Sequence, residues 1–232
     1  MRWILFVLTA LMIPALLSAK DDIWTNRGSE PGAKLIVNYY KDLYTKAGDY
    51  DSCWKYVEAL EFYSKNYVKK EEKKQWLEIA VKAGEKAVKL KPKGLEGLLW
   101  YGAVYGKLTE LNMDPAGVTK VIEIADKIIA IDPSFGGGTA YLMKARLYHK
   151  APGWPISIGD HDKALANYQL AYKYGKEIPV LYLYYAEFLV EKGKKPEALA
   201  LIEKGLKIKY DPLNPDHKKM KEKLAALKEK CK

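Results

Sequence analysis

The sequence predicts an all-α protein in which antiparallel helix hairpins stack into an α-α superhelix. Apolar residues recur at steps of three and four, as in Val118, Val121, Ile122 and Ala125, which is the spacing of one helix face. Prolines interrupt these patterns at intervals. No stretch alternates apolar and polar residues with valine, isoleucine and threonine enrichment, so strands are not expected.

Prolines and glycines divide the chain into ten predicted helices. The clearest stops are Pro92, Pro133, Pro179 and Pro212, because a proline excludes its predecessor from the helical region. The predicted helices span 33–47, 51–66, 69–91, 95–110, 115–131, 137–150, 160–175, 179–192, 195–209 and 216–230. No Pro/Gly/Ser-rich linker separates them, so residues 20–232 are expected to form a single helical-repeat domain with a C-terminal capping helix.

Residues 1–19 are predicted to be a signal peptide. Arg2 supplies a positive start, an apolar stretch follows from Trp3 to Leu17, and Ala19 ends it among small residues. The alternative is an uncleaved anchor, but the stretch is short for a hydrocarbon core about 30 Å thick. No cysteine follows it for lipid attachment, and no later run is apolar enough to span a membrane. The mature chain is therefore expected to be secreted or periplasmic, without an integral membrane segment.

A repeated motif underlies the helix stops. Pro179 and Pro212 are 33 residues apart, near a common helix-hairpin repeat period of about 34, and the preceding intervals of 41 and 46 residues would carry inserts of roughly seven and twelve. Leu98, Tyr101-Gly102 and Tyr105 begin one unit, and the turn Gly-x-x-x-x-Ala or its Cys variant occurs at Gly48, Gly159 and Gly193. From about residue 33 to 212 the chain resembles the tetratricopeptide-repeat superfamily. That resemblance implies stacked hairpins that bury their apolar faces against one another.

A narrower resemblance lies between residues 132 and 164. It is carried by Asp132-Pro133-Ser134-Phe135-Gly136-Gly137-Gly138, by Tyr148-His149-Lys150-Ala151-Pro152-Gly153-Trp154-Pro155-Ile156-Ser157-Ile158-Gly159-Asp160, and by Lys163-Ala164. This segment is similar to the T component family of TRAP-type (tripartite, ATP-independent periplasmic) transporters and to related bacterial envelope repeat proteins. The resemblance implies a periplasmic helical-repeat protein that docks an extracytoplasmic solute-binding protein.

Composition argues against nucleic-acid binding. The formal net charge is +10 with 39 lysines and arginines, but only Arg2, Arg27 and Arg146 are arginines. Nucleic-acid sites favour arginine, because its planar guanidinium group donates paired hydrogen bonds to phosphates and to the edge of guanine. Dispersed lysine and glutamate are typical of a solvated surface instead.

No motif predicts catalysis, a metal or a cofactor, so the chain is not expected to be an enzyme. Gly136, Gly137 and Gly138 lack the Gly-Lys-Ser/Thr of a phosphate loop and favour a turn between repeats. His149, His161, Asp160 and Asp162 lack the spacing of helical zinc ligands. Asp160 is interpreted as a helix cap and the histidines as surface residues. Cys53 is expected to be a buried thiol, with a disulfide to Cys231 as the alternative.

The aromatic content favours a protein-binding surface. Eighteen tyrosines and six tryptophans exceed what core filling alone requires. Trp154 lies in an insert between Pro152 and Pro155, and this insert either docks a partner or covers the top of its hairpin. Inner-face positions of the first helices are expected to be Leu99, Ala103, Lys107, Ala140, Lys144, Tyr148, Leu183, Glu187 and Glu191. The partner-binding candidates among all these residues are Tyr148, Trp154, Lys107, Lys144, Leu183 and Glu187.

The predicted function is that of an extracytoplasmic protein-protein interaction scaffold. Docking of a TRAP-type solute-binding protein is the specific form of this prediction. The alternatives are a general envelope-assembly scaffold and a binder of a small apolar ligand between helices. The lysine-rich segment from Asp216 to Lys232 is interpreted as a capping helix with a solvated face. The alternative is that its positive charge attracts anionic lipid or an acidic partner.

Overall fold

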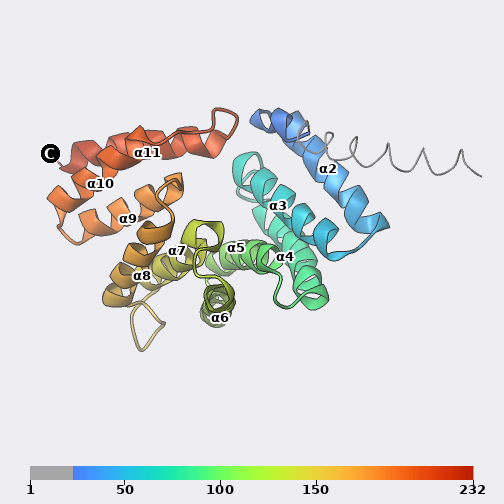
Figure 1. The fold of residues 1–232 in the computed structure, drawn as a ribbon, viewed down its shortest axis with the longest axis horizontal. Coiled ribbons are helices and arrows are strands. Elements are labelled where there is room, and N and C mark those ends of the chain that lie inside the picture. The colour runs from blue at the N-terminus through green and yellow to red at the C-terminus, as the bar shows by residue number, and fades with distance from the viewer. Residues whose placement is uncertain (1–22, 232) are drawn as a thin grey trace, which may run out of the picture.

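A computed structural model describes residues 23–231, and these residues form an all-helical superhelix (Figure 1). The elements are η1(Asn26–Gly28), α2(Glu30–Lys46), α3(Tyr50–Asn66), α4(Lys73–Leu90), α5(Leu95–Asn112), α6(Pro115–Ile131), α7(Phe135–Lys150), α8(His161–Tyr174), α9(Pro179–Glu191), α10(Lys195–Lys207) and α11(Pro215–Cys231). No β-strand occurs in this part of the chain. The predicted fold class is therefore confirmed. The predicted signal peptide, residues 1–19, lies outside the described residues.

Helix starts follow local sequence signals. The Asp49 and Asp160 carboxylates accept hydrogen bonds from backbone N–H groups of the first turns of α3 and α8. Proline stands at the first or second position of α2, α6, α9 and α10, where its missing N–H has no intrahelical partner. Asp160 is thus a helix cap, as predicted. The third predicted helix begins later than expected, at Lys73, because residues 69–72 form turns.

The triple-glycine segment begins α7 with a left-handed turn. Gly136, Gly137 and Gly138 have φ values of 57°, 64° and 68°, a region that residues with a side chain rarely adopt. A Cβ on Gly137 would lie 2.7 Å from Ile178 Cδ1, and one on Gly138 would lie 3.0 Å from Tyr174 Cβ. The glycines let this turn pack against the end of α8, which confirms the prediction of a turn between repeats.

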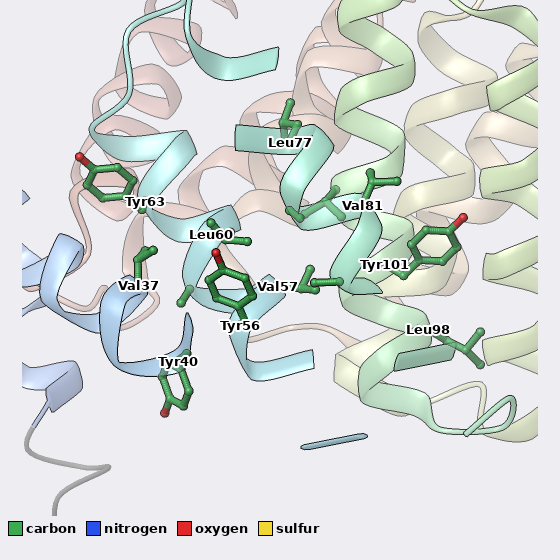
Figure 2. Close-up of a cluster of buried hydrophobic side chains, with 14 of the residues drawn as sticks. Val37, Tyr40, Tyr56, Val57, Leu60, Tyr63, Leu77, Val81, Leu98 and Tyr101 are labelled. Carbon is green, nitrogen blue, oxygen red and sulfur yellow. The ribbon is translucent and has the colours of Figure 1, made fainter. Parts of the chain in front are cut away.

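Two clusters of buried side chains meet at α7. The first runs from Ala33 to Ala140 and the second from Leu142 to Cys231. Figure 2 shows part of the first cluster, where Tyr56, Val57 and Leu60 of α3 lie among side chains of α2, α4 and α5. The buried tyrosines of the described chain are Tyr40, Tyr56, Tyr63, Tyr101, Tyr168 and Tyr182. Much of the aromatic content that the sequence suggested for binding therefore fills the core.

The last helix covers the end of the stack. Leu224 is completely buried, and Met220 and Leu227 pack against the second cluster. α11 contacts both α9 and α10.

Cys53 is buried and a free thiol, and burial raises its pKa. Cys231 is also free, so the alternative disulfide is absent.

None of the described helices is long and apolar enough to cross a membrane.

Candidate functional site

The inner face of the superhelix is built by alternate helices. Besides its neighbours in sequence, α3 contacts α5, α5 contacts α7, α7 contacts α9 and α9 contacts α11. Helices on the inside of a curved stack lie closer together than those on the outside. These five helices therefore line the concave face, with α4, α6, α8 and α10 behind them (Figure 1).

Ion pairs between neighbouring inner helices line this face. Lys107 of α5 pairs with Glu61 of α3, and the Glu61 side chain is only 13% exposed. Arg146 of α7 pairs with Glu187 of α9 at 2.8 Å. Burial alone would raise the pKa of Glu61, but the Lys107 and Lys65 ammonium groups outweigh burial and hold this pKa below its usual value. The inner face is therefore charged, with its charges largely paired.

The two ends of the superhelix touch. Arg27 of η1 pairs with Asp211, which precedes α11, at 2.5 Å between Nη2 and Oδ2. Lys65 near the end of α3 pairs with Asp216 in the first turn of α11. In Figure 1 the loop before α11 returns to the start of the described chain. We call these two ion pairs the clasp.

An open groove of about 500 Å³ lies between α7, α9 and α11. We call it the α9–α11 groove. Its apolar lining comes from α9 and α11, and its charged lining includes four cations and two carboxylates. The lining residues are Arg146, Lys150, Leu183, Glu187, Val190, Glu191, Lys223, Ala226, Leu227 and Lys230.

A buried histidine supports one wall of the groove. His149 Nδ1 lies 3.0 Å from the Tyr168 hydroxyl, and Nε2 lies 2.8 Å from Glu191 Oε2. Burial lowers the pKa of His149, which favours the neutral ring. A neutral ring satisfies both contacts when Nε2–H donates to Glu191 and Nδ1 accepts from Tyr168. Lys150 also pairs with Glu191.

The expectation that the histidines are surface residues is wrong for His149, because it continues the buried face of Ala145 on α7. His161 is exposed.

The insert between α7 and α8 projects from the body of the protein (Figure 1). We call residues 151–160 the projecting loop. Its base is closed by Gly159 N–H donating to Pro152 O at 2.8 Å and Asp160 N–H donating to Tyr148 O at 2.9 Å. Trp154 is 89% exposed and Ile156 is 73% exposed. The loop therefore does not bury its tryptophan as a cover for the hairpin.

The structure separates the six predicted partner-binding residues into four places. Leu183 and Glu187 line the α9–α11 groove, but Leu183 is only 4% exposed and belongs mainly to the second core cluster, so its predicted role as a surface contact is largely wrong. Tyr148 and Trp154 lie at the base and in the projecting loop, with Lys163 Nζ 5.6 Å from the Tyr148 ring centroid. Lys107 faces Glu61 on the inner surface, while Lys144 pairs with Asp126 of α6 at 2.5 Å.

Other inner-face positions deviate from the expected pattern. Ala140 is fully buried in the first core cluster, so it presents no surface. On α7 the groove is lined by Arg146 and Lys150. Arg146 and Lys150 were not among the predicted candidates, whereas the lysines of α11 belong to the segment for which attraction of anionic lipid or an acidic partner was the alternative interpretation. The available signal was the spacing of Lys223, Ala226, Leu227 and Lys230, which places all four on one helix face.

Within residues 23–231 no group of three or more histidine, cysteine, aspartate or glutamate side chains is placed to hold a metal ion.

Comparison with solved structures supports the repeat fold. The crystal structure of a thermophilic TPR (tetratricopeptide-repeat) protein of Thermus thermophilus superposes with a TM-score of 0.53 and 18% identity, covering 84% of this chain and 98% of that chain. The fold is a tetratricopeptide-like helical repeat. The crystal structure of MamA is also similar, at a TM-score of 0.44 and 20% identity, covering 70% of this chain and 90% of that chain.

Sequence comparison gives a partial match. Residues 17–126 match the model of a family described as regulator of microtubule dynamics protein 1-3. No protein of curated function matches the chain in sequence. These comparisons do not confirm the resemblance to the TRAP T component family.

Proposed function

We propose that this protein is an extracytoplasmic scaffold that binds another protein through the projecting loop. The observation that carries the proposal is the 89% exposure of Trp154 on a loop closed at its base by backbone hydrogen bonds. It is the exposed tryptophan of the described chain, since Trp24, Trp54, Trp76 and Trp100 are half-buried. Tryptophan is enriched among residues that dominate binding energy, and the hydrogen bonds that close the loop base reduce the backbone entropy lost on binding.

The extracytoplasmic part of the proposal rests on the predicted signal peptide, residues 1–19. The favoured partner is a solute-binding protein of a TRAP-type transporter, which the resemblance of residues 132–164 implies. A general envelope-assembly partner is the broader form of the same proposal. The proposal assigns the protein no chemical step.

The experiment is capture of partners from the envelope fraction of the source cells. We expect one main protein to be recovered by the wild type. The double variant Trp154→Ala/Tyr148→Ala should weaken capture by about 2 kcal/mol or more, the size expected of hot-spot residues. Because an apolar contact is not screened by ions, moderate salt should change capture little.

Met113→Ala is the matched control. Met113 is 86% exposed, apolar, and lies between two helices elsewhere on the surface. Its truncation should leave capture unchanged. Capture that is lost in salt but insensitive to the Trp154 and Tyr148 substitutions would argue against the projecting loop as the site.

The family match favours a second candidate partner. Residues 17–126 match a family named for the regulation of microtubule dynamics, so the microtubule is a defined target to test. Co-sedimentation with polymerised microtubules would support it. Retention of the protein in an extracytoplasmic fraction, with no co-sedimentation, would favour the envelope partner.

A further inference from the structure

The α9–α11 groove is lined by more cationic than anionic side chains. Arg146 pairs with Glu187 and Lys150 pairs with Glu191, so the two carboxylates of the groove are already engaged. Lys223 and Lys230 line the same groove, and no described residue forms an ion pair with either of them. The groove therefore carries an excess of positive charge on its α11 side.

On α11, Lys223 and Lys230 lie on either side of an apolar surface patch. Lys223 and Lys230 lie two helical turns apart on one face, which corresponds to about 10 Å along the axis. Ala226 and Leu227 lie between them on that face, and Leu183 and Val190 line the groove from α9. An occupant that matches this surface has an apolar middle flanked by negative charges about 10 Å apart.

We propose that the α9–α11 groove binds an acidic peptide segment of a partner protein, with apolar side chains over Ala226 and Leu227 and carboxylates at Lys223 and Lys230. Charge complementarity selects the acidic sequence, and the apolar lining supplies contact area that a free anion would not use. This inference rests on the proposed function only in that the ligand belongs to a protein. The site is distinct from the projecting loop.

Fluorescence anisotropy with a labelled synthetic peptide tests the groove directly. The probe is a synthetic peptide of about eight residues with two adjacent leucines between two glutamates, which places the carboxylates about 10 Å apart in an extended chain. A peptide with glutamine in place of glutamate is the uncharged comparison. We expect the acidic peptide to bind the purified protein and the glutamine peptide to bind at least about tenfold more weakly, because two ion pairs are lost.

Variants locate the binding on the protein. Lys223→Gln/Lys230→Gln should weaken binding of the acidic peptide about tenfold. The matched control is Lys218→Gln/Lys221→Gln, which removes the same charge from the opposite face of α11 and should leave the affinity within about twofold. Leu227→Ala should weaken the binding of both peptides, since it removes apolar contact. Melting temperatures confirm that each variant is folded.

Three results would overturn the proposal. The first is no binding of the acidic peptide. The second is equal loss in the two lysine double variants, which would indicate general attraction to a basic surface. The third is loss of peptide binding in Trp154→Ala, which would place the peptide at the projecting loop. By contrast, if Trp154→Ala does not affect capture from the envelope fraction, this result argues against binding through the projecting loop and leaves the groove proposal intact.

Discussion

Arg27 and Asp211 are 184 residues apart in the sequence, yet Nη2 of Arg27 and Oδ2 of Asp211 lie 2.5 Å apart. Lys65 and Asp216 form the second pair of the clasp beside them. An open repeat superhelix has free ends, because each unit contacts only its neighbours. The clasp joins the ends of this superhelix across the inner face that α3, α5, α7, α9 and α11 line.

Removal of the clasp should open the superhelix. Asp211→Asn/Asp216→Asn deletes both carboxylates. The Arg27–Asp211 pair is partly exposed, so we expect it to contribute only ~1 kcal/mol or less to folding stability, whereas Asp216 is 9% exposed and its loss should cost more. The expected result is a larger radius of gyration in small-angle X-ray scattering with nearly unchanged helix content. Glu123→Gln, which removes an exposed partner of Lys120 within α6, is the control and should leave the radius unchanged. An unchanged radius in the double variant would mean that other contacts hold the ends together.

Gly102 should be intolerant of a large side chain. A Cβ at this position would lie 2.6 Å from Met143 Cε and 3.0 Å from Ile124 Cγ2, so α5 crosses its neighbours closely here. Gly102→Leu should lower the free energy of unfolding by ~1–3 kcal/mol or more through overpacking. Urea denaturation measures the change.

Gly106 provides the contrast on the same helix. A Cβ there would lie 3.7 Å from the nearest Val121 methyl groups, which is ordinary contact. Gly106→Ala should therefore raise stability by ~0.5–1 kcal/mol, the gain in helix propensity. A loss of stability in Gly106→Ala, or none in Gly102→Leu, would contradict the packing of α5 described above.

Leu224 should account for much of the stabilising effect of α11. Its side chain is completely buried in the second core cluster. Leu224→Ala should destabilise the protein by ~2–5 kcal/mol, from lost burial and the cavity left behind. Leu213→Ala, at a side chain that is 39% exposed, is the control and should cost much less. Similar melting temperatures for the two variants would show that α11 does not seal the stack.

Stability should fall as the pH decreases from neutrality through about 6.5, the ordinary pKa of histidine. Burial lowers the pKa of both His149 and His217, and His217 Nδ1 accepts a hydrogen bond from Asp211 N–H. At about one pH unit above 6.5 and higher these rings are neutral in both the folded and the unfolded state, and the pH dependence vanishes. Below this range the unfolded chain binds protons that the folded protein resists, so the free energy of unfolding decreases until the lowered folded-state pKa values are reached.

The histidine variants assign this pH dependence. His149→Gln/His217→Gln should flatten the change in melting temperature between about pH 7 and 5.5, where carboxylates are still ionised in both states. His161→Gln, at an exposed ring, should leave the dependence as in the wild type. A wild-type melting temperature that is constant over this range would contradict neutral burial of His149 and His217.

Local sequence determined the helices and their order. Proline stops, the capping residues Asp49 and Asp160, and the glycine turn at 136–138 act within a few residues, so their effects can be inferred without knowing the rest of the chain. The apolar stripe of α11 also predicted a capping helix, since a stripe on one side must be buried against a neighbour. The burial of Cys53 could also be predicted locally, because this residue occupies the small-residue position of the hairpin turn motif, where two helices cross.

Tertiary structure alone decided which charged side chains meet. The clasp depends on the accumulated rotation of every hairpin between Arg27 and Asp211, and small angles per repeat are not encoded in any short motif. The α9–α11 groove likewise needs three helices in one register before Arg146 and Lys223 line the same space. His149 shows the limit most directly: its sequence neighbours allow either a surface or a core position, and only the packing of Tyr168 and Phe188 against its ring determines that it is buried.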